Sequence, residues 1–374
     1  MNILLCSSTY EGITHGPAKF ANLVMQINEL YPEHEVRAIT RDVEEETPNS
    51  IYKFERTYPP FIGAFWEFWD NRLFLDNIKK VSKDFKPDAI VFVDAILGYK
   101  SAKVFKGKIK TVGLVNDDEY INNKLSAIKP TKEWLIKWKS RQLEKRAAKA
   151  LDVVIGNSNF ISAKISSAYQ IPKSKVKRLY KSIDISKFDY VEHGAIDTDK
   201  TIKVFFVKND YKRGGLMELA ESLAKLSRYK FEVIISGPHD HQKSTVENYF
   251  SGKQNVNYHF KGKTQQQEVR QLMDSCDILC VPALREGLGV ANMEGLAKGI
   301  PVVSTNAGGI PEVLDGEMCG WIAEARDIDS LAATIEKCIL SEDLRKKKSA
   351  AGRKRVEQMF GHNKMLQDLI DIIS

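Results

Sequence analysis

The segment from Asp277 to Thr305 constrains the fold most, because a strand, a glycine loop, a helix and a second strand follow one another there. Asp277-Ile-Leu-Cys-Val281 is almost continuously apolar, which is typical of a strand covered on both faces. Gly299 ends the helix, Pro301 prevents its continuation, and Pro301–Thr305 forms the next strand. The segment therefore predicts a strand–helix–strand unit of an α/β sheet.

The loop inside this unit has the groups needed to bind a phosphorylated sugar. Its glycines let the backbone approach a ligand, and the free N–H groups at the helix start form an anion site suited to a diphosphate. Glu286 lies on the loop and Glu294 about one turn inside the helix, so two carboxylates flank the anion site. The pattern predicts a nucleotide-sugar site formed by Glu286, Gly287, Leu288, Gly289, Val290 and Glu294.

Glu286 and Glu294 form a Glu-x7-Glu pair inside Pro-x3-Glu-Gly-x-Gly, and Gly308-Gly-x-Pro-Glu312 follows the next strand. This combination resembles the signature of the family 4 retaining glycosyltransferases (glycosyl transferases group 1), which have the GT-B fold. The resemblance implies that Glu286 lies by the donor sugar, that Glu294 holds the ribose, and that loop amides bind the phosphates. The alternative is an ordinary strand–helix–strand unit with surface carboxylates.

The rest of the chain alternates short apolar runs with amphipathic helices, as in doubly wound α/β sheets, and 374 residues suit two domains. Polar Ser186–Lys200 is the predicted break. The resemblance implies a GT-B arrangement of two Rossmann-like doubly wound domains facing a central cleft: 1–186 on the acceptor side, 187–355 for the nucleotide sugar, and a C-terminal helix, 356–374, packing back on the N-terminal domain.

Two further stretches bear on this arrangement. Lys173 to Phe188 resembles the family's stretch ending in Asn-Gly-Val-Asp-x3-Phe, here with Lys181-Ser-Ile-Asp184. The helix near Asp343–Phe360 matches in place the family's helix that crosses back to the first domain. The predicted strands are Asn2–Cys6, Glu35–Ile39, Ala89–Asp94, Thr111–Val115, Val153–Gly156, Lys203–Val207, Glu232–Ser236, Val256–Phe260, Asp277–Pro282 and Pro301–Thr305.

The basic residues expected to bind phosphate depart from the family pattern. Aligned on Gly215, the family's Gly and Arg become Lys208 and Asn209, and its Lys becomes Gly214. Arg213 and Lys208 are therefore the first candidates for neutralising the leaving diphosphate, and Lys212 is the third candidate. Arg213 is also expected to act in catalysis. The alternative is that all three are solvated charges in a turn.

The acceptor side is expected around the loop after the first strand, with Gly12 and Gly16, where Gly16-Pro17 occupies the place of the family's paired glycines. Gly16 is also expected to bind the donor, because this loop is expected to touch the donor phosphates. Asp117 stands where the family often has a His. Two interpretations of Asp117 stay open: it accepts a proton or a sugar hydroxyl bond, or it caps an acidic helix start.

The sequence does not favour a metal site or a bound cofactor. Asp197-Thr-Asp199, Asp327-Ile-Asp329 and His239-Asp-His241 are interpreted as surface loops, since basic side chains and helix N-termini can stabilise a diphosphate without a cation. We expect no cofactor, and a UDP-sugar in preference to a GDP-sugar as the donor substrate. The start reads as a first strand and the five cysteines contain no CxxC, which favours a cytoplasmic protein.

The basic excess, +7, gathers in the predicted first domain. Basic residues share the helix Trp134–Ala150 with Trp138, and Phe61–Trp69 is strongly aromatic. This pattern suits peripheral docking on the inner face of an anionic membrane, while a packed aromatic helix with solvated lysines is the alternative. No recognition motif for nucleic acid accompanies the charge.

These features predict a hexosyltransferase-type glycosyltransferase that moves a sugar from a nucleotide-diphosphate donor to a glycan or glycolipid hydroxyl in cell-surface polysaccharide or glycolipid biosynthesis. The alternatives are a catalytically inactive GT-B module that binds nucleotide or glycan, and a related sugar-nucleotide epimerase or phosphorylase.

Overall fold

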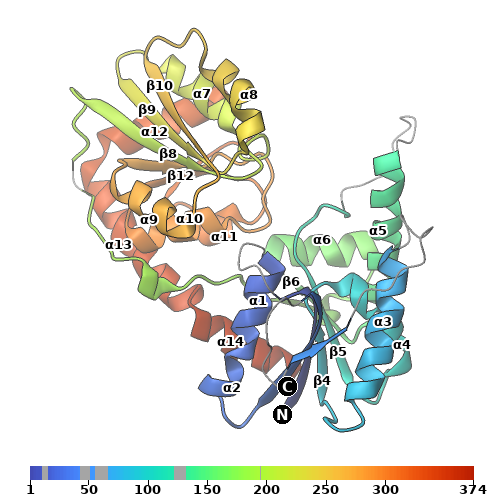
Figure 1. Cartoon of the computed structure of the whole chain (residues 1–374). Coiled ribbons are helices and arrows are strands. Elements are labelled where there is room, and N and C mark those ends of the chain that lie inside the picture. Colours follow the sequence, from blue (N-terminus) through green and yellow to red (C-terminus); the bar gives the residue numbers. More distant parts are fainter. Residues whose placement is uncertain (11–15, 43–50, 55–65, 122–131, 194) are drawn as a thin grey trace. The chain divides into compact units, whose positions relative to one another are not determined.

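The computed structural model describes residues 1–10, 16–42, 51–54, 66–121, 132–193 and 195–374 (Figure 1). The chain forms two compact units, Met1–Leu179 with Leu366–Ser374 and Tyr180–Met365. The division thus falls between Leu179 and Tyr180, a few residues before the polar stretch that the sequence favours. Gly12 and Phe61–Phe65, named above, lie outside the described residues.

The first unit is built on a parallel sheet that has seven strands among the described residues, in the order β3-β2-β1-β4-β5-β6-β7. The strands are β1 Asn2–Thr9, β2 Glu35–Asp42, β3 Ile51–Lys53, β4 Ala89–Phe92, β5 Lys110–Val115, β6 Val153–Gly156 and β7 Val176–Arg178. The helices are α1 Gly16–Met25, α2 Ile27–Leu30, α3 Trp66–Val81, α4 Tyr99–Val104, α5 Lys132–Ala150 and α6 Asn159–Tyr169. The apolar runs of its central strands form the core.

The second unit repeats this plan with a parallel sheet of six strands in the order β10-β9-β8-β11-β12-β13, again counted among the described residues. Figure 1 labels β8, β9, β10 and β12 of this sheet. The strands are β8 Thr201–Val207, β9 Lys230–Ser236, β10 Val256–Gly262, β11 Ile278–Cys280, β12 Val302–Thr305 and β13 Trp321–Ala323. The helices are α7 Leu216–Lys225, α8 Lys243–Phe250, α9 Gln266–Asp274, α10 Val290–Lys298, α11 Ile310–Val313, α12 Ile328–Leu340 and α13 Glu342–Met359.

The strand order reverses at β8, which pairs with β9 on one side and with β11 on the other. Val204 pairs with Ile278 and Phe205 with Leu279, so the loops that leave the carboxyl ends of β8 and β11 start side by side. Open α/β sheets bind ligands at such a switch point, outside the carboxyl ends of the strands. The sheet therefore brings the loop after β8 and the loop after β11 to one place.

The end of the chain differs from the sequence-based expectation. The helix expected near Asp343–Phe360 to return to the first domain is α13, which lies in the second unit and packs on α10. Its Gly352 makes room there, because an added Cβ would lie 2.6 Å from a methyl group of Leu296. Residues 366–374, most of α14 (His362–Ile373), belong to the first unit instead.

Candidate functional site

The loop after β11 is held in place by its neighbours in the second unit. The Thr305 hydroxyl at the end of β12 donates to the carbonyl of Ala283 at 2.6 Å. The amide of Gly309, in the glycine turn after β12, donates to the carbonyl of Glu286 at 3.3 Å. Leu288 buries its side chain in the core, so a ligand can meet only the backbone at this position.

Helix α10 begins directly after this loop with its first amides unsatisfied by any side-chain cap. Gly289 is the N-cap residue and has φ of 98°, a left-handed conformation that favours glycine. The first-turn N–H groups of Val290 and Ala291 lie at the positive end of the helix dipole, which suits an anion, whereas the Asn292 amide already donates to the carbonyl of Gly289 at 3.1 Å. Glu294 lies one turn further and accepts a hydrogen bond from Gln266 of α9 at 3.2 Å. Gln266 was not predicted as a site residue.

The loop after β8 lies directly against the loop after β11. Gly215 has φ of 77°, and an added Cβ would lie only 2.1 Å from the carbonyl oxygen of Pro282. The amide of Leu284 donates to the carbonyl of Arg213 at 2.8 Å, which ties the two loops together. The backbone contact explains why glycine stands at 215, and the Leu284 bond holds the Arg213 backbone beside the loop after β11.

Arg213 and Lys212 differ in their surroundings. The backbone N–H of Arg213 donates to the Asp210 carboxylate at 3.1 Å, and its guanidinium Nε is buried with no hydrogen-bond partner among the residues that the structure describes. Lys212 is exposed to solvent. A buried donor left unpaired at an anion site is a candidate contact for a ligand oxygen.

The central contact of the site is an ion pair between Lys208, at the end of β8, and Glu286. The other carboxylate oxygen of Glu286 accepts from the amide of Gly287 at 3.1 Å. Burial alone would raise the pKa of Glu286, but the charges of Lys208 and Lys181 and the Gly287 amide together lower it. Glu286 is therefore an anion at neutral pH.

Lys181 is a site residue that the motif analysis did not single out. It follows Tyr180, whose hydroxyl donates to the Glu312 carboxylate of α11 at 3.1 Å, and this contact fixes the segment near the glycine turn. The signal was present in the sequence, because Lys181 stands where the resembling family has the Asn of its Asn-Gly-Val-Asp stretch.

Two predicted acceptor-side residues lie in the first unit. Gly16 is exposed and opens α1, and none of the residues that the structure describes lies within 4 Å of an added Cβ there. Asp117 follows β5 and accepts a hydrogen bond from the amide of Glu119 at 2.8 Å, as an acidic cap of its own turn. Gly12 lies outside the described residues.

Asp94, after β4, is a titratable neighbour of Asp117 that the sequence analysis missed. Burial raises the pKa of Asp94 to about 6, helped by the charge of Asp117 and opposed by the Ile96 amide and the charge of Arg41. Two acidic groups that interact electrostatically therefore follow adjacent strands β4 and β5.

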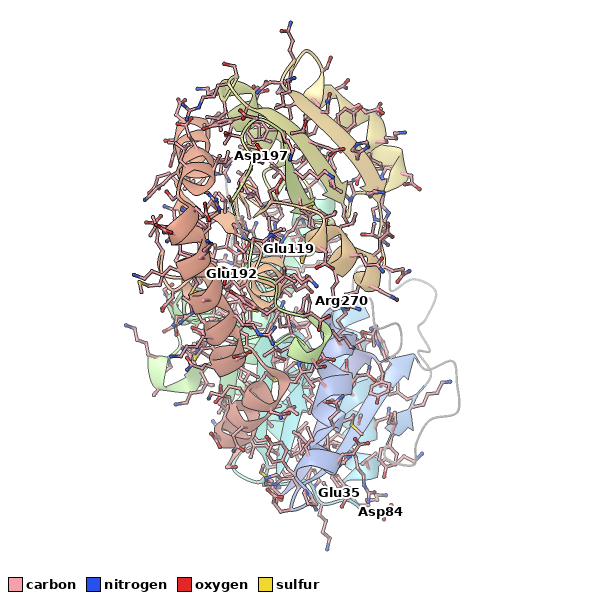
Figure 2. All side chains as sticks on the ribbon, turned by 90° about the vertical axis from the view of Figure 1, so that its left-hand side faces the viewer. Glu35, Asp84, Glu119, Glu192, Asp197 and Arg270 are labelled. Atoms are coloured by element: carbon pink, nitrogen blue, oxygen red, sulfur yellow. The ribbon has the colours of Figure 1, made fainter. Side chains whose placement is uncertain are left out.

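The acidic strings examined as metal sites have other partners. Asp197, labelled in Figure 2, pairs with Lys200 at 2.9 Å, and Asp327 caps α12 by accepting from the Ser330 amide at 2.9 Å. Within the described ranges, no group of three or more His, Cys, Asp or Glu side chains is placed to hold a metal ion. In those same ranges, no helix is long and apolar enough to cross a membrane.

Comparison with known families and proteins gives consistent matches. The family described as Glycosyltransferase Family 4 matches residues 26–187, and the family described as Glycosyl transferases group 1 matches residues 186–355. The amylovoran biosynthesis glycosyltransferase AmsK of Erwinia amylovora is 33% identical over 118 residues, which cover 30% of this chain and 29% of AmsK. The chain spans less than two thirds of the length of this and the next curated relatives that it matches.

Solved structures resemble the whole fold. Sucrose-phosphate synthase from Thermosynechococcus elongatus superposes with a TM-score of 0.76 at 15% identity, covering 99% of this chain and 98% of the other. Anabaena Alr3699/HepE in complex with UDP and glucose gives 0.70 at 13% identity, with 99% and 98% covered. Since the two family matches together run from residue 26 to residue 355, the chain belongs to the family 4 glycosyltransferases of GT-B fold.

Proposed function

We propose that the chain is a retaining glycosyltransferase that moves a sugar from a nucleoside-diphosphate donor to a hydroxyl of a glycan or glycolipid, in cell-surface polysaccharide or glycolipid biosynthesis. The observation that carries the proposal is the meeting of Lys208, Glu286 and the uncapped start of α10 at the switch point of the second sheet. The name of AmsK, an amylovoran biosynthesis glycosyltransferase, supports the polysaccharide assignment. The UDP bound in the HepE structure supports a UDP-sugar in preference to a GDP-sugar as the donor.

Each group in the second unit has a chemical task in this proposal. The amides of Leu288 to Val290 and the guanidinium of Arg213 receive the diphosphate beside Gly287, while Glu294 accepts from the ribose hydroxyls. Glu286 accepts from hydroxyls of the transferred sugar. When the glycosidic bond breaks, negative charge builds on the leaving phosphate oxygen, and the nearby cations and helix dipole stabilise it. No metal ion is assigned a role.

The acceptor side is assigned to the first unit. Gly12, Gly16 and Asp117 are the residues proposed for it, and the aromatic and basic surface of α5 is proposed to hold the protein at the cytoplasmic face of a membrane. Retention of the anomeric configuration is proposed from the family to which the chain belongs.

The first test is a donor screen. The purified chain is heated with UDP-, GDP- and ADP-sugars, because a ligand at about 100 times its Kd stabilises the folded state by about 2.7 kcal/mol. Stabilisation together with slow hydrolysis of the donor supports the proposal. Stabilisation without any turnover on acceptor glycans indicates the inactive binding module, and an epimerised or orthophosphate-dependent product indicates the related enzymes.

The second test separates the two carboxylates. Glu286→Ala is expected mainly to lower kcat, because Glu286 acts on the sugar in the transition state, whereas Glu294→Ala is expected mainly to weaken nucleotide binding. Glu286→Gln and Glu294→Gln serve as matched variants that keep the side-chain shape. Wild-type turnover in a folded Glu286→Ala or Glu294→Ala variant contradicts the proposed site.

A further inference from the structure

In the proposed function, one short loop faces two anions, the Glu286 carboxylate and the diphosphate of the donor. Glu286 is ionised and its own loop leads into the amides that receive the diphosphate, so the carboxylate and the phosphates repel each other. The repulsion between two like charges grows as they approach and as water is excluded from between them. A donor can bind beside the ionised carboxylate only if a cation offsets this repulsion.

Lys208 is the cation that the backbone presents for this purpose. Its amide donates to Ser236 at 3.0 Å, and an added Cβ on Gly237 would lie 2.5 Å from the Lys208 carbonyl carbon. The backbone of Lys208 is therefore held in place at the carboxyl ends of the neighbouring strands β8 and β9. The Lys208 and Glu286 side chains keep 27% and 18% of their surface exposed, so the pair is accessible to a ligand.

Gly214 makes room for the stem of this lysine. A Cβ at position 214 would lie 3.0 Å from both Cβ and Cγ of Lys208, and 2.7 Å from the ring of Phe206. A side chain at 214 would therefore displace either the lysine stem or a core ring. Glycine at 214 and lysine at 208 form one steric unit.

We propose that Lys208 is a positioning residue whose single ammonium group is shared between Glu286 and the diphosphate of the donor, so that phosphate binding and the carboxylate are coupled. An ammonium group has three N–H donors, so it can serve both anions. Lys181 adds a second positive charge near Glu286. The inference rests on the proposed function, and it assigns to the Lys208–Gly214 unit the task of making Glu286 compatible with the diphosphate.

A double-mutant cycle tests the coupling. UDP, GDP and ADP are titrated calorimetrically into the wild type, and the nucleotide that binds most tightly is then titrated into Lys208→Met, Glu286→Gln and the double variant. Loss of a hydrogen bond to a charged group corresponds to about 1.5–3 kcal/mol, so Lys208→Met is expected to weaken binding about 10- to 150-fold. In the Glu286→Gln background, Lys208→Met is expected to weaken nucleotide binding much less, because no unpaired carboxylate is left facing the phosphates.

Three further measurements distinguish sharing from a structural role. The matching nucleoside monophosphate is expected to lose less affinity on Lys208→Met than the diphosphate does. Lys208→Arg is expected to recover most of the lost affinity, and Gly214→Ala to weaken diphosphate binding with the lysine still present. Melting temperatures of all variants establish that each is folded.

The outcomes separate the two proposals. If none of the three diphosphates binds the wild type, the proposed function fails, and this inference fails with it. If a diphosphate binds but the effects of Lys208→Met and Glu286→Gln simply add, the function stands and the sharing is wrong. Equal losses for the mono- and diphosphate also overturn the sharing.

Discussion

At the scale of single residues, Arg213 combines an anchored backbone with an unsatisfied head group. Its carbonyl accepts from Leu284 and its amide donates to Asp210, while its Nε is buried without a hydrogen-bond partner among the described residues. An unsatisfied buried donor costs about 1–3 kcal/mol, so a ligand oxygen at this point recovers that free energy.

Arg213→Ala is therefore expected to reduce kcat/KM by roughly 2–4 kcal/mol of transition-state stabilisation, the scale of one oxyanion contact. Lys208→Ala is expected to reduce kcat/KM less than Arg213→Ala does. Lys212→Ala is expected to change kcat/KM little, because Lys212 is exposed. The measurement is donor turnover in the three variants, with melting temperatures as the folding control. A neutral Arg213→Ala beside an impaired Lys212→Ala would mean that the loop register is misassigned.

Asp94 gives a pH dependence of stability in the first unit. Burial raises its pKa to about 6, so the folded chain holds this proton more tightly than the unfolded chain, whose Asp titrates near pH 4. Stability falls as pH rises from about 4 to about 6 and is constant above, a loss of up to about 3 kcal/mol. Asp94→Asn keeps an acceptor for the Ile96 amide and removes the charge.

We therefore expect Asp94→Asn to unfold at higher denaturant concentration than the wild type at pH 7.5, and at the same concentration near pH 4. Asp117→Asn is the comparison variant. Because the charge of Asp117 raises the pKa of Asp94, this substitution is expected to lower that pKa. A stability difference that is the same at both pH values would show that the charge of Asp94 is not its cause.

At the scale of elements, α5 has one packed face and one face that carries aromatic and basic side chains. Ser140, Glu144 and Ala147 are buried, whereas Leu135 is 44% exposed and Trp134 stacks on Trp138 with ring centroids 6.4 Å apart. Of the basic residues of the helix with described side chains, Arg146 and Lys149 are exposed, and Lys137 pairs with Glu119 at 3.4 Å. The others, Lys139, Arg141 and Lys145, are half-buried. An apolar and basic surface of this kind suits an anionic lipid layer.

The chain is expected to co-sediment with vesicles that contain phosphatidylserine and to dissociate as salt is added, because each basic residue near the surface contributes about 1 kcal/mol. Replacing Trp134 and Trp138 by Ala is expected to weaken the binding, whereas Met318→Ala, on the second unit and 62% exposed there, serves as the control. Absence of binding at low salt would rule out the docking surface.

The sequence predicted most strands of both sheets because buried parallel strands are continuous apolar runs. It did not predict β3, β7 and β13, which lie at the edges of their sheets among the described strands, each with one neighbouring strand and only three residues. The site loop was recognisable from its glycines and carboxylates. The Lys208–Glu286 pair was not, because it joins residues 78 positions apart and depends on the pairing of β8 with β11.

At the scale of the whole molecule, each unit has its own hydrophobic core, but the first unit also includes the last residues of the chain. In this segment Leu366, Leu369, Ile370 and Ile373 are almost fully buried. Burying a side chain of this size contributes about 1.5–3 kcal/mol, so the four together are comparable to the whole stability of a domain, about 5–15 kcal/mol.

A chain that stops after Met365 is therefore expected to lose the cooperative unfolding transition of the first unit and to keep that of the second. Calorimetry and limited proteolysis with mass spectrometry measure this, with Ile373→Ala as a milder variant expected to cost about 2–5 kcal/mol. A truncated chain that melts like the full chain would contradict this role of the segment.

The membership of residues 366–374 in the first unit also has a consequence for biosynthesis. The ribosome finishes residue 179 long before residue 366, and the intervening 186 residues, 180 to 365, take roughly 10–40 s at about 5–20 residues per second. During that interval the nascent first unit lacks the apolar side chains that complete it. The second unit, although synthesised later, is continuous in the chain and can reach its native state first.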